Sequence, residues 1–195
     1  MEEQELMHLV QEGDEAAFEK IVVMYKHRIV NFLTQMTGDY QKAVELAQET
    51  FMRVYFKADR YKPIAPLSAW IYTIASNLAR TELKKMRKLS TVSLDDMHNS
   101  VGSQVASKDE TQDTYLIKSV KRALSSLHPR YRIPVILKDI EGFSQDEIAQ
   151  MLKRPVGTIK ARISRGRDHL KKALEQDAKK TGIAAKTEEF QHGNT

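Results

Sequence analysis

The sequence predicts an all-α protein made of two small helical domains joined by a flexible linker. Glycine and proline are scarce, at 8 and 5 of 195 residues, so few positions break a helix. Apolar residues recur at three- and four-residue spacing in both halves of the chain. Between the halves lies a stretch rich in Ser, Asp, Thr and Gln, whose apolar surface is too small to offset the entropy of ordering it.

The first domain is assigned to residues 1–90 and is predicted to consist of helices. Its clearest apolar stripe follows helical spacing and comprises Phe18, Ile21, Val22, Tyr25, Ile29, Phe32, Leu33 and Met36. Glycine can end one helix and aspartate can cap the next, and two such pairs punctuate the pattern: Gly13-Asp14 and Gly38-Asp39. In the last helical run, after Pro66, the spacing of Trp70 with Leu67, Ile71 and Ile74 favours a core position for Trp70.

Composition sets the remaining boundaries. Residues 91–113 are assigned to the flexible linker, because periodicity is lost there and resumes at Leu116. The second helical domain is then 114–176, and residues 177–195, which carry no pattern, are predicted to be a disordered tail.

Charge is distributed in blocks along the chain. The formal net charge of +5 is the sum of −4 over residues 1–57, +5 over 58–90, −4 over 91–115, +9 over 116–180 and −1 over the last fifteen. Two basic blocks indicate two surfaces that meet a polyanion such as nucleic acid. The alternative at this point is that solvated helix faces happen to be lopsided in charge.

A helix-turn-helix pattern stands in the second domain. Ser144, followed three residues later by Glu147, forms a capping box that fixes a helix start. Ile148, Ala149 and Leu152 then face inward, and a tight turn around 153–157 leads into a second helix. Helix-turn-helix geometry also occurs where two helices merely pack together and bind no DNA. The residues on the outer face of the second helix therefore have to distinguish the two interpretations.

The outer face of that second helix suits DNA. Ile159, Ile163 and Gly166 lie on its inner side, whereas at 100° per residue the opposite side presents Thr158, Ala161, Ser164, Arg165 and Asp168, with Lys160 at its shoulder. A long cation, a small apolar group and a hydroxyl are the types that read base edges. Arg162 and Arg167 flank this face, where they are placed for phosphates.

At this level of detail the chain resembles bacterial extracytoplasmic-function sigma factors of the sigma-70 family. The second domain is similar to their region 4 through Leu127–Arg132, Ile148–Leu152 and Pro155–Ile163. The first is similar to their region 2 through Gly13–Phe18, Glu45–Phe51 and Trp70–Asn77. The resemblance covers about residues 5–175, in the family's order and spacing.

The resemblance implies a dissociable subunit of bacterial RNA polymerase that selects promoters. Three polar residues would bind the core polymerase: Glu45, Gln48 and Glu49. Recognition of the minus-ten element, where a flipped base is captured, would fall to Asn77, Arg80 and Lys84. Recognition of the minus-thirty-five element would fall to Lys160, Ala161, Ser164 and Arg165, with Thr158 and Arg162 beside them.

The chain departs from the family's usual pattern at a few positions. Val44 stands where a second acidic residue commonly precedes Glu45, and Leu67 stands where an aromatic is usual. After Asn77 the family often has Asp and then Arg, whereas this chain has Thr81 and Lys84. Lysine cannot reproduce a bidentate arginine contact, so the minus-ten preference of relatives should not be transferred.

Partners and alternatives complete the expectations. The resemblance implies core RNA polymerase, promoter DNA and an anti-sigma factor as partners, in the cytoplasm, with no catalytic residue of its own. No cofactor or metal is expected, because the chain has no cysteine and its six histidines are scattered. The longest apolar run, Ile21–Met24, is too short to enter a membrane. The rival function is a free-standing helix-turn-helix regulator, although no dimerisation helix is evident.

Overall fold

The computed structural model describes residues 2–92 and 112–181, and every regular element in that part of the chain is a helix. The first five elements are α1 (Glu3–Gln11), α2 (Glu15–Thr37), α3 (Tyr40–Phe56), the short 3₁₀ helix η1 (Ala58–Arg60) and α4 (Leu67–Val92). The other four are α5 (Gln112–Ser126), α6 (Pro129–Asp139), α7 (Gln145–Leu152) and α8 (Val156–Thr181). The predicted all-α fold is confirmed, and none of the described helices is long and apolar enough to cross a membrane.

The helix boundaries follow the glycine–aspartate punctuation of the sequence. Asp14 accepts the backbone N–H of Ala17 at 3.0 Å and so caps α2. Gly38 ends that helix at φ 76°, a left-handed conformation in which a side chain would be strained. Asp39 then caps α3 by accepting from the N–H of Lys42 at 3.0 Å. Both predicted helix starts are confirmed.

The first domain is a bundle in which α2 packs against α1, α3 and α4. Most of the predicted stripe is buried, with Ile21, Ile29, Phe32, Leu33 and Met36 fully enclosed. Trp70 is partly buried against this core, and its ring centroid lies 5.4 Å from that of Tyr61. Trp70 therefore packs against the core, as expected, but it is only partly buried.

The second domain is the helix-turn-helix. Both hydrogen bonds of the predicted capping box are present, from the N–H of Glu147 to Ser144 at 3.1 Å and from the N–H of Ser144 to Glu147 at 2.7 Å. Ile148, Ala149 and Leu152 are buried as expected. A Cβ added at Gly166 would lie 2.5 Å from Cγ2 of Val135, so glycine permits the close approach of α8 to α6.

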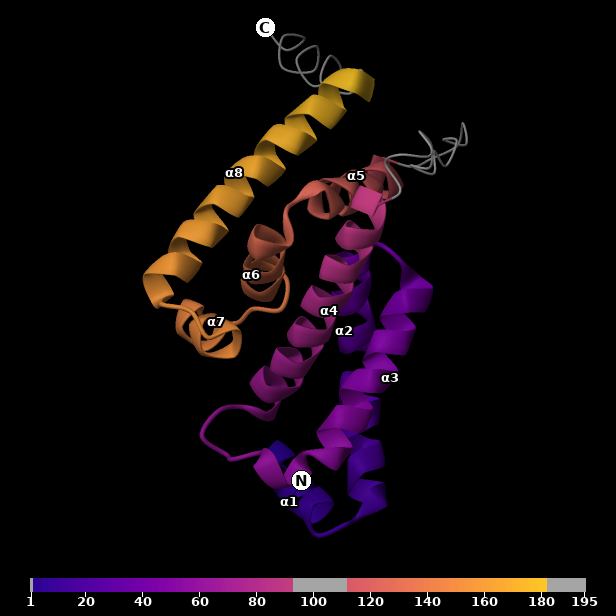
Figure 1. The fold of residues 1–195 in the computed structure, drawn as a ribbon, viewed down its shortest axis with the longest axis vertical. Coiled ribbons are helices and arrows are strands. Elements are labelled where there is room, and N and C mark those ends of the chain that lie inside the picture. The colour runs from indigo at the N-terminus through magenta and orange to yellow at the C-terminus, as the bar shows by residue number, and fades with distance from the viewer. Residues whose placement is uncertain (1, 93–111, 182–195) are drawn as a thin grey trace, which may run out of the picture.

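The two domains pack against each other, which the sequence pattern did not predict. Helices α6 and α7 lie between α8 and the long α4, and α5 packs against α2 (Figure 1). Helix α4 ends two residues later than the first-domain boundary at 90, and α8 runs five residues past the second-domain boundary at 176. Residues 93–111, the greater part of the predicted linker, and 182–195 lie outside the described residues.

Candidate nucleic-acid interface

The polar residues of α3 lie on a face turned away from the bundle. Glu45 and Gln48 are exposed and Glu49 is half-buried, whereas Leu46 and Ala47 are in the core. Each carboxylate has a partner one turn away on its own helix: Lys42 lies 2.5 Å from Glu45, and Arg53 lies 2.7 Å from Glu49. Exposed ion pairs of this kind contribute little to stability. These carboxylates can therefore exchange their local cations for those of a partner at little cost.

The predicted minus-ten residues lie along one side of α4. Asn77, Arg80 and Lys84 are all exposed, spaced by one turn each. The Arg80 guanidinium donates to the Asn77 side-chain oxygen at 2.6 Å, and the Thr81 hydroxyl donates to the Asn77 backbone carbonyl at 3.0 Å. The structure thus joins an amide and a cation in one polar unit on the helix surface.

The outer face of α8 is open. Lys160, Ala161, Ser164 and Arg165 are exposed, and Thr158 is half-buried at the start of the helix. Arg167, which the helical wheel placed for phosphates, instead pairs with Asp139 at the end of α6, with Nε 3.0 Å from the carboxylate. That ion pair raises the pKa of Arg167, mainly through the hydrogen bond. Arg167 therefore ties α8 to α6.

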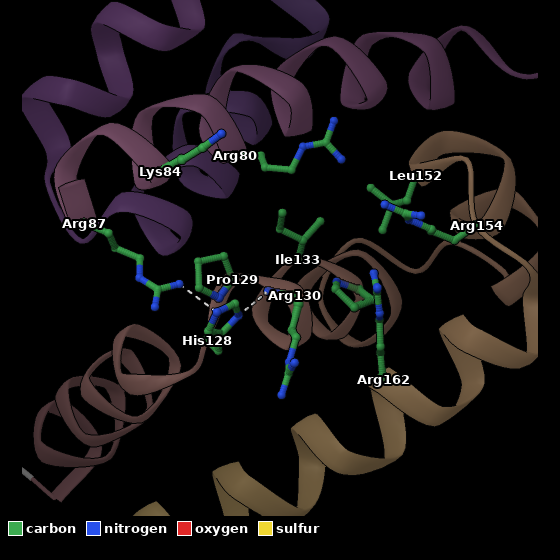
Figure 2. Close-up of a pocket in the computed structure, with 11 residues that line it drawn as sticks. Arg80, Lys84, Arg87, His128, Pro129, Arg130, Ile133, Leu152, Arg154 and Arg162 are labelled. Atoms are coloured by element: carbon green, nitrogen blue, oxygen red, sulfur yellow. Dashed lines mark hydrogen bonds between the residues drawn. The ribbon is translucent and has the colours of Figure 1, made fainter.

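A cavity of about 600 Å³ lies between the two domains (Figure 2). Its lining residues are Arg80, Lys84, Arg87, His128, Pro129, Arg130, Ile133, Pro134, Leu152, Arg154 and Arg162. The structure therefore brings Arg80 and Lys84 together with Arg162, but it leaves the other predicted residues of α3 and α8 outside this cavity. Sequence reasoning missed His128, Arg130 and Arg154 as site residues, although Arg154 stands in the predicted turn and the others at a helix start.

Positive charge dominates this cavity. Among the lining residues that the structure describes, none is a carboxylate and six are Arg or Lys. Burial lowers the pKa of Arg162, and the nearby charges of Arg154 and Arg130 lower it further. Burial also lowers the pKa of His128, with added repulsion from Arg87, Arg130 and Arg132. The cavity is thus a site that favours an anion.

A cluster of four side chains and a buried arginine hold the domains in contact. The Tyr72 hydroxyl of α4 donates to the Glu141 carboxylate, whose side chain is only 7% exposed and which lies 3.7 Å from Arg28 of α2. Burial raises the pKa of Glu141, against the opposing effects of Tyr72 and Arg28. The Tyr72 ring also stacks edge-on against Phe143, at 5.1 Å between centroids. Arg28, Tyr72, Glu141 and Phe143 thus join α2 and α4 to the connection between α6 and α7.

The buried arginine is Arg132 of α6, which reaches across to the C-terminal end of α2. Its guanidinium donates to the backbone carbonyl of Met36 in the first domain and to those of Ser125 and Leu127 in its own. Carbonyls at a helix C-terminus carry partial negative charge and lack intrahelical donors. Arg132 therefore satisfies acceptors of both domains from one buried position.

The fold and these surfaces define a class: a two-domain, all-α protein with a helix-turn-helix whose second helix presents an exposed polar and basic face. Comparisons with known proteins agree. Residues 21–89 match the family described as sigma-70 region 2, and residues 117–170 match sigma-70 region 4. Both matches fall within the domains assigned from the sequence.

Relatives that match over most of the chain identify the family within this class. The chain is 33% identical over 173 residues to the ECF RNA polymerase sigma factor SigW of Bacillus subtilis, covering 85% of this chain and 92% of SigW. It is 29% identical over 182 residues to the RNA polymerase sigma-H factor of Pseudomonas aeruginosa, covering 89% and 94%. The chain belongs to the ECF sigma factors of the sigma-70 family, the promoter-recognition subunits of bacterial RNA polymerase.

Solved structures share the fold. The sigma factor RpoE of Bartonella quintana, in complex with the anti-sigma factor NepR, matches with a TM-score of 0.65 at 26% identity, covering 81% of this chain and 96% of that one. CnrH, in complex with the cytosolic domain of CnrY, matches with a TM-score of 0.66 at 21% identity, covering 88% and 96%.

Proposed function

We propose that this sigma factor divides its work among three helices. The outer face of α3 docks on core RNA polymerase, the exposed side of α4 captures the minus-ten element, and the outer face of α8 reads the minus-thirty-five element. The observation that carries the proposal is the exposed set Lys160, Ala161, Ser164 and Arg165, held outward by a capped helix-turn-helix.

On α4, Asn77 and Arg80 would work as a pair. An amide offers a donor and an acceptor to the edge of a flipped base, and the neighbouring guanidinium offers charge to the adjacent phosphate. The hydrogen bond between them orients the amide before DNA arrives. Lys84, one turn further on, would contact the backbone as a point charge and make affinity fall with salt.

The packed arrangement of the domains does not suit both promoter elements at once. The two elements are centred about 25 base pairs apart, or about 85 Å at 3.4 Å per base pair. Arg80 of α4 and Arg162 of α8, by contrast, line one cavity. We infer that the domains separate when the chain joins polymerase on a promoter, and we call the packed arrangement the closed state.

Regulation and location follow from the same assignment. Because the relative RpoE is solved in complex with an anti-sigma factor, we propose that an anti-sigma factor controls this chain as well. Its place of action would be the bacterial cytoplasm, where polymerase and promoters are. The chain would supply no catalytic residue, since the polymerase performs the chemistry.

The direct test mixes purified chain with core bacterial RNA polymerase and a pool of genomic promoters. Stable association and new, sequence-selective start sites are the expected results, and alignment of the starts would give both promoter elements. Selective duplex binding by the chain alone, with no association to core enzyme, would instead establish a free-standing regulator.

Two matched variants test whether the outer face of α3 binds polymerase. Because Glu45 and Gln48 are exposed, the double substitution E45A/Q48A should leave the fold intact and weaken polymerase binding by about tenfold. The control is E19A, an exposed acid on α2, which should bind polymerase as the parent chain does. Loss of helical signal in the double variant would mean that α3 needs these residues for folding.

A further inference from the structure

The cavity between the domains is built from two cationic walls. Figure 2 shows Arg80, Lys84 and Arg87 on α4, with Arg154 and Arg162 on the opposite side. Within residues 2–92 and 112–181 no carboxylate lines the cavity, so the closed state places like charges across a shared space. Repulsion of this kind opposes closure unless a counter-charge enters.

His128 and Arg87 bring the two domains together at one end of the cavity. Nδ1 of His128 lies 3.2 Å from the backbone nitrogen of Arg130, and Nη1 of Arg87 lies 2.7 Å from its Nε2. A neutral imidazole has only one acceptor nitrogen, so the ring can accept from one of these two donors at a time. The cationic wall of α4 therefore meets the start of α6 at this point.

The rest of the lining indicates what else the ligand carries. Pro129, Ile133, Pro134 and Leu152 add apolar surface among the cations. The volume of about 600 Å³ falls within the range of small-molecule sites, roughly 300–1,000 Å³. Several cations can pair with more than one phosphate group. The apolar surface can pack against a flat, weakly polar group. A nucleoside polyphosphate combines both.

We propose that a nucleoside polyphosphate binds in this cavity, bridges the cations of α4 to those of the helix-turn-helix, and stabilises the closed state. Arg80, Lys84 and Arg162 would then be occupied by the ligand rather than by DNA, so that the bound chain would engage promoters less well. That last consequence rests on the proposed function, whereas the binding site itself does not.

The first experiment measures binding of ATP, without added metal, to the free full-length chain at physiological salt by titration calorimetry. We expect one ATP per chain, and weaker binding of inorganic phosphate, which lacks both the phosphate chain and the base. Absence of ATP binding at millimolar concentration would overturn the proposal, as would a stoichiometry well above one, because several ATP molecules per chain would mean diffuse attraction.

Matched charge variants locate the site. Arg87 and Arg154 are exposed, so the double substitution R87Q/R154Q should keep the fold, checked by circular dichroism, and weaken ATP binding about 10- to 100-fold. The control K171Q/K172Q removes two exposed charges of α8 that do not line the cavity, and it should bind ATP as the parent chain does. Equal losses in both variants would overturn the proposal.

A third readout separates this inference from the proposed function. ATP should raise the fraction of closed chains, measured as an interdomain distance in the free protein, and R87Q/R154Q should abolish that response. Since neither polymerase nor DNA is present, a negative result here leaves the promoter-recognition assignment intact. ATP binding that leaves the distance unchanged would overturn the stabilising role.

Discussion

In the closed state, the two helix surfaces that we propose contact DNA, on α4 and α8, differ in how accessible they are. The outer face of α8, with Lys160, Ser164 and Arg165, is exposed and lies outside the interdomain cavity. The side of α4 that carries Arg80 and Lys84 looks across that cavity at the other domain. In the proposed function, closure would therefore leave the minus-thirty-five surface available while it places the minus-ten residues opposite like charges. Opening would then be the step that delivers α4 to the promoter.

The contacts that hold the closed state are apolar as well as polar. Tyr72 and Phe143 supply the aromatic part, whereas Glu141 and Arg132 supply hydrogen bonds across the boundary. One apolar cluster includes buried residues of both domains, Leu83 and Phe143 among them, so separation of the domains has to expose apolar surface. Substitutions at these contacts test the closed state, and substitutions on each exposed helix surface test the role proposed for that surface.

The largest effect is expected from Arg132→Met. The substitution keeps an unbranched, flexible stem but removes the guanidinium, which leaves buried carbonyls of Met36 and Leu127 without their charged donor and should cost about 3 kcal/mol of unfolding free energy. Urea denaturation measures it. The control is Arg130→Met, because the exposed Arg130 guanidinium stacks on Tyr131 at 4.5 Å and is worth about 0.5–1 kcal/mol. Equal losses in the two variants would mean that Arg132 does not bridge the domains.

Next comes Gly166→Ala, which tests how α8 is held for reading DNA. The added Cβ would lie 2.5 Å from Cγ2 of Val135, so α8 and α6 must move apart, at about 2 kcal/mol for an overpacked contact. Thermal unfolding measures the loss. The double variant G166A/V135A should recover part of it, since the clashing atom is gone. An unchanged melting temperature in G166A would contradict the close approach of the two helices.

The substitution Arg165→Ala distinguishes sequence-specific base recognition from general electrostatic attraction to DNA on the outer face of α8. Arg165 is exposed on the outward side of α8, where a bidentate base contact would be worth about tenfold in affinity, or ~1.4 kcal/mol. Binding should fall for the selected minus-thirty-five element and change little for scrambled DNA. A uniform loss on all sequences would reassign Arg165 to a phosphate.

The smallest effect is expected from pH. The pKa of His128 is lowered from its ordinary value of 6.5 by burial and by Arg87, Arg130 and Arg132, so the closed state favours the neutral ring. This contribution is present above pH 6.5 and is lost as the pH falls through the lowered pKa. Glu141, whose pKa is raised, titrates in the opposite sense. The interdomain distance should therefore show an acid opening step that is missing in His128→Asn, and identical pH curves would contradict this role.

Local features of the fold could be predicted from the sequence because each is encoded within a few residues. Gly38-Asp39 sets a helix end and a helix start, and Ser144 with Glu147 sets another start. The outward face of α8 follows from helical periodicity alone. Periodicity also placed Trp70 against the core rather than in solvent.

The closed state could not be predicted in the same way. Tyr72 sits at a core-like spacing, yet its partner Glu141 lies 69 residues away, in a short connection without periodicity. Arg132 shows no sign in the sequence that distinguishes it from an exposed cation, although it is only 6% exposed in the structure. Contacts between domains depend on shape and on pairs distant in sequence, and single-chain patterns carry neither.

The most direct test of the central claim is an interdomain distance measured before and after promoter binding. The chain has no cysteine, so cysteines introduced at the exposed positions Lys26 on α2 and Lys171 on α8 can carry paired spin labels. The account predicts one narrow, short distance in the free protein and an increase of tens of ångströms in the complex with core polymerase and promoter, in keeping with elements about 85 Å apart. The same distance in both samples, or a broad distribution in the free chain, would contradict a closed state that opens on the promoter.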